Sequence, residues 1–120
     1  MDINGILKKI QEHPDSDKMG MIASHLGVVR GSSRDGRIVT RIEVSYDHEI
    51  INNIIRDIKS IAGIVELVVD INEGQLEIGD TLMFVAVGGD IREHVFPALI
   101  EAVDRIKRDA CKKKEFFEKN

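Results

Sequence analysis

Two lysines near the end of the chain, Lys107 and Lys114, have a spacing that would let them act together. If one helix continues as far as Lys114, they lie two turns, or about 10 Å, apart on one face. On a helical wheel that face is otherwise apolar and consists of Phe96, Leu99, Ile100, Val103, Ile106 and Ala110. An ammonium group turned toward the protein loses water and can serve as an acid, a base or an anion ligand. The alternative is that both side chains run along the edge of the core to reach solvent.

Other candidates for chemistry are single residues or short turns. Arg30 ends a predicted strand before a glycine-containing loop, where a guanidinium can bind an anion or form a surface ion pair. Cys111 stands beside three lysines, which predicts a lowered thiol pKa and leaves a nucleophilic role open. The turn Gly88-Gly89-Asp90 is either an anion-binding helix start or a tight structural turn. The histidines have no metal-ligand spacing, so the sequence predicts no metal site.

Length and composition narrow the class of protein. A chain of 120 residues is expected to form one domain, 1–120, with a helix and linker over 1–18. The net charge of −4 disfavours nucleic-acid partners and acidic membranes, yet five of the eight residues in 107–114 are basic, which suits a small anionic ligand. The single cysteine fits a reducing compartment, and no apolar run spans a bilayer. We therefore expect a soluble cytoplasmic protein.

Hydrophobic periodicity predicts helices and strands in alternation. Helices are expected over the first dozen residues, from Asp47 as N-cap to a stop at Gly63, and from the turn at 88–90 through the lysines, with Pro97 near the start or at a kink. Strands are expected at 21–29, 37–46, 64–71 and 82–87, with a short extended piece between 74 and 79. In 37–46 the residues expected on the buried face are Ile38, Thr40, Ile42, Val44 and Tyr46. Antiparallel neighbours with helices packed on one side form an α+β fold.

The strand at 82–87 is apolar throughout and is expected at the centre of the sheet, buried on both faces. A chain of this length supplies few helices to cover it. We therefore expect a homodimer in which a second copy contributes to that cover.

Residues 19–115 carry a series of short motifs in a characteristic order. The series opens with HLGVVR at 25–30, continues with GQLEIGD at 74–80 and the strand after it, and closes with Arg92 and the K-x6-K spacing of Lys107 and Lys114. In order and spacing these motifs resemble F-x-G-x-V-R, G-x-L-x-x-G-D, a histidine–arginine pair and K-x6-K of the molybdopterin synthase large (catalytic) subunit family.

That resemblance implies a fold, a reaction and a set of partners. The fold would be an α/β hammerhead, and the enzyme a sulfurtransferase that needs no cofactor. Its substrate would be cyclic pyranopterin monophosphate, which receives two sulfurs to form the dithiolene of molybdopterin. A small ubiquitin-like partner would carry the sulfur as a thiocarboxylate on its C-terminal Gly-Gly. Two such partners would flank a homodimer of large subunits.

The resemblance also implies roles for five cationic residues. Lys107 and Lys114 would be catalytic, because an ammonium can stabilise developing negative charge and transfer protons. Arg30, Arg92 and Lys113 would bind the phosphate of the substrate or the tail of the partner.

Departures from the family pattern leave two alternatives open. The family histidine is Ile91, the first phenylalanine is His25, and the usual Pro-x-Trp is Cys111-Lys112-Lys113. One alternative is a divergent enzyme that acts on a related phosphorylated metabolite. The other is a non-catalytic homologue that binds a sulfur-carrier protein or a phosphorylated pterin. Retention of Lys107 and Lys114 favours the synthase.

Overall fold

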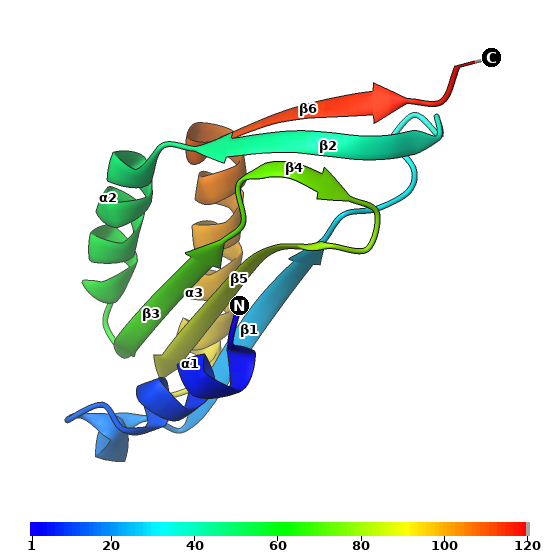
Figure 1. Cartoon of the computed structure of the whole chain (residues 1–120). Helices are drawn as coiled ribbons and strands as arrows, with labels where there is room; N and C mark the ends of the chain where they lie inside the picture. Colours follow the sequence, from blue (N-terminus) through cyan, green and yellow to red (C-terminus); the bar gives the residue numbers. More distant parts are fainter. Residues whose placement is uncertain (120) are drawn as a thin grey trace.

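Three helices and six strands make up the computed structural model, which describes residues 1–119 (Figure 1). The helices are α1 (Ile3–Gln11), α2 (His48–Lys59) and α3 (Arg92–Arg105). The strands are β1 (Met21–Val28), β2 (Val39–Tyr46), β3 (Ile64–Ile71), β4 (Gly74–Glu77), β5 (Thr81–Gly89) and β6 (Cys111–Phe117). A 3₁₀ turn at Ser16–Lys18 follows α1, and one π-helical turn at Ile106–Ala110 joins α3 to β6. None of the helices in this part of the chain is long and apolar enough to cross a membrane.

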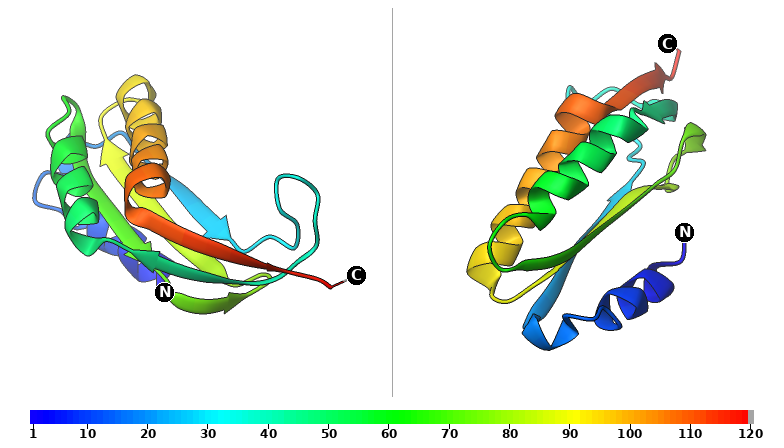
Figure 2. Two further views of the ribbon diagram at one scale, coloured as in Figure 1. Left: turned by 90° about the horizontal axis from the view of Figure 1, so that it is seen from above. Right: turned by 90° about the vertical axis from the view of Figure 1, so that its left-hand side faces the viewer.

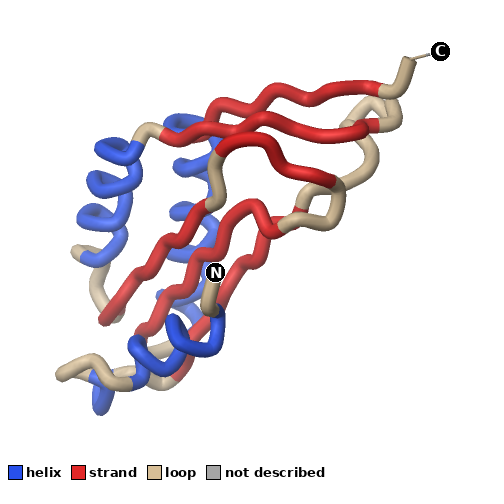
Figure 3. Tube along the Cα trace, viewed as in Figure 1, coloured by secondary structure: helices blue, strands red, loops and turns tan. Residues whose placement is uncertain are grey.

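The strands form two antiparallel three-stranded sheets, in the orders β1-β5-β3 and β4-β2-β6. Helices α2 and α3 cover one face of the first sheet, and α1 lies on the opposite face (Figure 2). The second sheet extends away from the helices and gives an elongated molecule of 56 × 25 × 24 Å (Figure 3). The predicted α+β class and antiparallel pairing are confirmed. The prediction that helices pack on one side holds for α2 and α3, whereas α1 packs on the other.

The central strand β5 is covered on both faces by its own chain. Met83, Val85 and Val87 belong to the main core with α2 and α3. Phe84 and Ala86 pack with Ile10 of α1 in a second, smaller cluster. The predicted two-sided burial is confirmed. The cover that we expected from a second copy is supplied by α1.

The predicted N-cap of α2 is confirmed, whereas the helix ends at Lys59, four residues before the predicted stop at Gly63. The Asp47 carboxylate accepts a hydrogen bond from the Ile50 backbone N–H at 3.1 Å, which caps the helix. After the helix, Gly63 has a φ of 88°, a conformation that glycine adopts without steric cost. The face that α2 turns to the core consists of Ile51, Ile54 and Ile58.

The predicted alternation in β2 is correct for only part of the strand. Ile38 and Thr40 are exposed, while Val39 between them is buried. The pairing of β2 with β6 shifts at a β-bulge between Val39 and Arg41, and a bulge moves the following residues to the other face. The residues whose burial was predicted correctly are Ile42, Val44 and Tyr46.

The predicted continuation of the last helix to Lys114 is wrong. Helix α3 ends at Arg105, and the backbone N–H of Cys111 donates to the Ile106 carbonyl across the π turn. From Cys111 onward the chain pairs with β2, so strand pairing prevails over the helical preference of the lysines. The buried face of α3 also differs from the predicted one, because Phe96 and Ile100 are 49% and 61% exposed. The residues that α3 buries are Val95, Ala98, Ala102 and Val103.

Candidate functional site

A cavity of about 540 Å³ opens where the end of β1, the π turn and the start of β6 meet. Four cationic side chains line it, and among the described residues Glu115 is the one carboxylate in its wall. Its uncharged polar wall includes His25, Tyr46 and Cys111. The cationic residues are Arg30, Arg34, Lys107 and Lys113.

Backbone pairing brings these residues together from distant parts of the chain. The Asp47 N–H donates to the Ala110 carbonyl at 2.9 Å, which fixes the end of the π turn beside the start of α2. In the β2–β6 ladder Cys111 lies opposite Tyr46, so β6 starts against the buried end of β2. The Val29 N–H donates to the Asp80 carbonyl at 2.9 Å and holds the chain just before Arg30.

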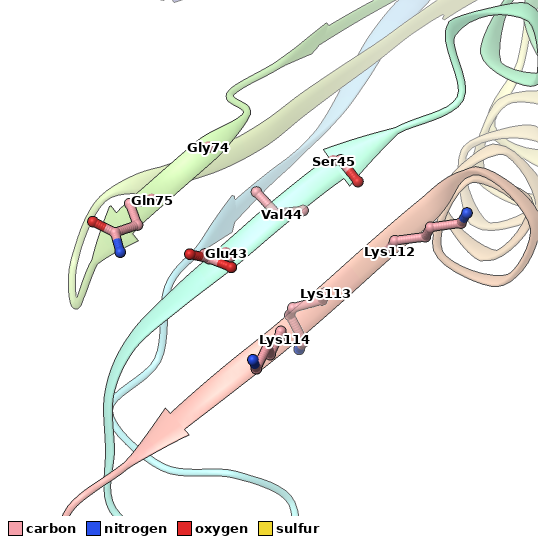
Figure 4. A pocket seen from close by; sticks show the side chains of 8 residues that line it. All are labelled: Glu43, Val44, Ser45, Gly74, Gln75, Lys112, Lys113 and Lys114. Atoms are coloured by element: carbon pink, nitrogen blue, oxygen red, sulfur yellow. The ribbon is translucent and has the colours of Figure 1, made fainter.

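Strand geometry divides the three consecutive lysines of β6 between two faces. Successive side chains of a strand point to opposite sides, so Lys113 lines the cavity together with its alternate neighbours Cys111 and Glu115. Lys112 and Lys114 line a second, open pocket on the outer face beside Glu43 and Ser45. Lys113 also borders that pocket, but its side chain passes behind the strand (Figure 4). The prediction that Lys107 and Lys114 share one face is therefore wrong within this chain. The lysine that shares the cavity with Lys107 is Lys113.

The surroundings of Lys114 differ from those of the cavity. It lies opposite Glu43 in the β2–β6 ladder, and its ammonium is 5.0 Å from the centre of the Phe116 ring. Both neighbours favour a cation at this surface.

The cations of the cavity are available to a ligand. Within residues 1–119 no carboxylate forms an ion pair with Arg30, Lys107 or Lys113. The Arg30 Nε donates to the Ser32 carbonyl at 2.8 Å, which orients the guanidinium. Lys107 is exposed, so the partly desolvated ammonium expected from the helical wheel is not observed. Cations free of carboxylates in one cavity of an acidic protein are the arrangement of an anion-binding site.

Three titratable side chains of the cavity wall, those of His25, Tyr46 and Cys111, favour their neutral forms near neutral pH. Burial raises the pKa of the Cys111 thiol more than its interaction with Tyr46 and the charges of Lys113 and Lys107 lower it, so the predicted lowered pKa is wrong. Burial also raises the pKa of Tyr46. Burial, followed by the charge of Lys107, lowers the pKa of His25. Among the described residues the buried Nε2 atom of His25 has no hydrogen-bond partner.

Arg92 lies far from this cavity. It begins α3, whereas Lys107 follows the end of that helix, and a helix of this length separates them by on the order of 20 Å. Its Nε is 3.3 Å from the Glu93 carboxylate in an exposed ion pair. The structure therefore does not bring Arg92 and Arg30 together within one chain.

The predicted turn at 88–90 is mostly strand, because Gly88 and Gly89 are the last two residues of β5 and pair with both β1 and β3. A Cβ on Gly89 would lie 2.6 Å from the Gly63 carbonyl oxygen, so only glycine fits there. At the start of α3, the Asp90 carboxylate accepts from the Ile91 N–H at 2.7 Å and lies 2.8 Å from His94 Nδ1. The Asp90 carboxylate therefore lies at the start of α3, where an anionic ligand would otherwise bind.

Several members of the cavity were not predicted from the sequence. Arg34 comes from the loop after β1, Tyr46 was predicted only as a buried residue of its strand, and His25 was noted only as a departure from a motif. Strand alternation over 111–115 would have assigned Lys113 to the face of Cys111. Among residues 1–119 no group of His, Cys, Asp and Glu side chains is placed to hold a metal ion.

Solved structures of molybdopterin synthase components share this fold. Molybdopterin synthase from Staphylococcus aureus aligns with a TM-score of 0.74 at 23% identity, over 87% of this chain and 79% of that one. The molybdopterin cofactor biosynthesis protein E of Burkholderia multivorans gives 0.77 at 22%, over 98% and 82%. A complex of subunits 1 and 2 of molybdopterin-converting factor from Helicobacter pylori gives 0.73 at 16%, over 100% and 82%. At these identities the likeness shows the fold.

The family itself follows from the sequence. No curated protein matches the chain significantly. A family model described as MoaE protein matches residues 1–109, which include His25, Arg30 and Lys107 and end just before β6. The match covers most of the chain, and the chain therefore belongs to the MoaE family, that of the molybdopterin synthase large subunits.

Proposed function

We propose that this protein is the catalytic subunit of a molybdopterin synthase, which transfers sulfur from a thiocarboxylated partner to cyclic pyranopterin monophosphate. Family membership supports the broader role, an enzyme of molybdopterin biosynthesis. The observation that carries the specific reaction is the cavity in which Arg30, Lys107 and Lys113 have no carboxylate partner within residues 1–119. Both reactants are anions, and this cavity concentrates positive charge on a protein whose net charge is −4.

The cationic side chains match the charges of the reaction. Arg30 and Lys113 would bind the phosphate, because guanidinium and ammonium groups form strong charge-assisted hydrogen bonds to phosphate oxygens. In that reaction the partner's sulfur bonds to the pterin, and water then attacks the acyl carbon of the resulting thioester. The acyl C–S bond breaks, so that the sulfur stays on the pterin and the partner keeps a carboxylate, and negative charge develops on the acyl oxygen in that step. The Lys107 ammonium would stabilise that charge and supply a proton to the leaving group.

The roles of Lys114 and Arg92 remain proposals that need a second surface. Lys114 faces away from the cavity, and Arg92 lies a helix length from it. Either residue would reach a reactant only if another subunit placed that reactant over its surface. We propose that the assembly contains a small ubiquitin-like subunit with a C-terminal Gly-Gly and a second copy of this chain, and that it works in the cytoplasm. The solved complex of two subunits from Helicobacter pylori supports the small partner.

The test is reconstitution of the reaction. The purified chain is incubated with cyclic pyranopterin monophosphate and the thiocarboxylated partner, and the product is oxidised to a fluorescent pterin. We expect product with the unchanged chain and a rate about 10²–10³-fold lower with Lys107→Ala, the size of effect seen when one donor to a developing oxyanion is removed. Absence of product with the unchanged chain and a loaded partner would reject the proposal.

A matched control comes from the outer face of the same region. Lys112→Ala removes an ammonium a few residues from Lys107, but from the surface beside Ser45. We expect it to change the rate less than twofold, since exposed charges of this kind contribute little. Arg105→Ala is a poorer control, because Arg105 pairs with Asp57 of α2 at 2.9 Å and its loss would disturb packing.

A second candidate function is a non-catalytic homologue that binds a sulfur-carrier protein or a phosphorylated pterin. The observation that favours it is the exposed Ile91, 47% accessible, at the position of the family histidine. Such a protein would bind the partner, measured by calorimetry, and yield no product in the same reaction. The two measurements together separate the candidates.

A further inference from the structure

His25 occupies a position in the cavity wall that the proposed reaction has not yet used. It lies in β1 opposite Val85 of β5, and it is turned inward while its neighbours Ser24 and Leu26 are exposed. Its Nε2 atom is buried and has no hydrogen-bond partner among residues 1–119. Buried polar atoms in folded proteins are nearly always paired. An unpaired nitrogen in the wall of a ligand-sized cavity is therefore placed to meet a ligand.

Gly27 lies beside Nε2 in the same cavity wall. A Cβ on Gly27 would lie in ordinary contact with His25 Nε2, at 3.5 Å, and closer to Met83 Cγ, at 3.2 Å. Glycine therefore places no side chain between the imidazole and the cavity that both residues line.

The charges around His25 favour its neutral form when the cavity is empty. Burial and the Lys107 ammonium both lower the pKa of the ring. An anion bound against Lys107 offsets the effect of that ammonium on the His25 pKa, because it neutralises the positive charge. It also offers an acceptor to Nε2–H. The other charged or titratable groups that line the cavity are Tyr46 from β2, Cys111, Lys113 and Glu115 from β6, and Arg30 and Arg34 from the loop after β1.

We propose that His25 contacts, through Nε2, an oxyanion held in the cavity by Lys107, and that it takes up a proton from solvent when this oxyanion binds. The inference rests on the proposed function insofar as both assign the cavity to anionic reactants. The oxyanion is either the phosphate of the small substrate or the carboxylate of the partner's tail. Both are tetrahedral or planar oxygen acceptors that a protonated imidazole can bind. Affinity for the oxyanion should accordingly rise as the pH falls.

Two probes distinguish the sources of the oxyanion. Inorganic sulfate stands for the phosphate, and N-acetyl-Gly-Gly stands for the tail; both keep a constant charge near neutral pH, so any proton uptake belongs to the protein. Each is titrated into the full chain while the imidazole resonances are followed by NMR between about pH 5 and pH 8. The resonance of His25 is identified by its absence in His25→Gln. The other three histidines, His13, His48 and His94, serve as internal references.

The expected result is a higher His25 pKa in the presence of one probe, with unchanged values for the reference histidines. As the pH is lowered, the affinity for that probe should increase, by at most about tenfold for each unit by which the probe raises the His25 pKa. In His25→Gln and His25→Phe the probe should still bind through Lys107, with an affinity that depends less on pH. Phenylalanine is the residue of the family motif at this position, so one variant is expected to fold even if the other does not.

The proposal is overturned if neither probe binds, if saturation with both leaves the His25 pKa unchanged, or if the variants keep the pH dependence of the original chain. These outcomes are independent of turnover. A chain that makes product but shows no change at His25 would retain the proposed function and lose this inference. A chain that makes no product but shows the change would lose the function and retain the oxyanion contact.

Discussion

Lys113 and Lys114 are neighbours in sequence, yet the structure gives them different surroundings. Lys113 shares a cavity with Lys107, whereas Lys114 lies opposite Glu43 on the outer face. We expect Lys113→Ala to raise the KM for the pterin substrate about tenfold, since a charge-assisted contact contributes roughly 1.5–3 kcal/mol. Lys114→Ala should change KM less than twofold. Steady-state kinetics with the fluorescent-product reaction measures both.

The opposite ranking of the two substitutions would give information about the assembly. If Lys114→Ala impairs the reaction more than Lys113→Ala, the outer face of β6 must take part in catalysis. That face is open in the single chain, so another subunit would have to cover it.

Cys111 should be dispensable for sulfur transfer. Burial raises the pKa of its thiol, so the thiolate that attacks sulfur or carbon is scarce at neutral pH. We expect Cys111→Ala to keep most of the activity, because the sulfur arrives on the partner. Mass spectrometry of the chain during turnover provides an independent check. A persulfide on Cys111, or an inactive variant, would make the chain a sulfur carrier in its own right.

At the scale of elements, the junction between β2 and α2 supports the cavity. The Asp47 carboxylate caps α2, and its backbone N–H holds the end of the π turn. We expect Asp47→Ala to lower the free energy of unfolding by about 1 kcal/mol, the usual effect of losing an N-cap. Urea denaturation measures the change.

Glu49→Ala is the matched control for the cap. Glu49 is an exposed acidic residue in the first turn of the same helix and makes no capping hydrogen bond among the described residues. Its loss should cost only a few tenths of a kcal/mol through the helix dipole. Equal effects of the two substitutions would show that charge, and not the hydrogen bond, stabilises this end of α2.

Elements with a strong local pattern could be predicted from the sequence. The isoleucine stripe of α2, its cap at Asp47 and the apolar strand β5 all have the expected positions. The end of α3 could not be predicted, because the π turn and the pairing of β6 with β2 depend on a strand that lies far away in the sequence. The bulge after Val39 could not be predicted either, because it depends on the pairing of β2 with β6. It changes which side chains of β2 face the core, and no residue of the sequence signals it.

Individual residues of the candidate site could be predicted from the sequence, but their grouping in one cavity could not. Arg30 and Lys107 were singled out, and the structure places both in one cavity. Lys114 was assigned to the wrong face, since a helical wheel does not apply to a strand. His25 was noted only as a departure from a motif. Which residues share a cavity is decided by tertiary contacts that periodicity does not report.

At the scale of the whole molecule, the second sheet is the feature that favours self-association. Within residues 1–119 its outer strands β4 and β6 each pair on one side only. Strand edges of this kind promote pairing with another chain, and Val28 and Ile38 nearby are about half exposed. The exposed strand edges are therefore the reason to expect a dimer. The earlier reason, an uncovered face of β5, no longer applies because α1 covers that face.

We therefore keep the prediction of a homodimer. Light scattering at micromolar concentration should give twice the chain mass of 13.5 kDa. A monomer throughout that concentration range would contradict the prediction. Proline substitution at an edge position of β6, for example Lys112→Pro, should shift the equilibrium toward monomer if this edge forms the interface.

The alternation of β6 also has a consequence for how this site tolerates sequence change. Insertion or deletion of one residue in the π turn would exchange the two faces of the strand, because side chains alternate with a period of two. In most strands such a slip would replace every functional group. Here three lysines follow one another, so after a slip Lys112 or Lys114 would face the cavity in place of Lys113. The repeated residue would therefore keep a lysine of β6 on the cavity face whichever register the strand adopts.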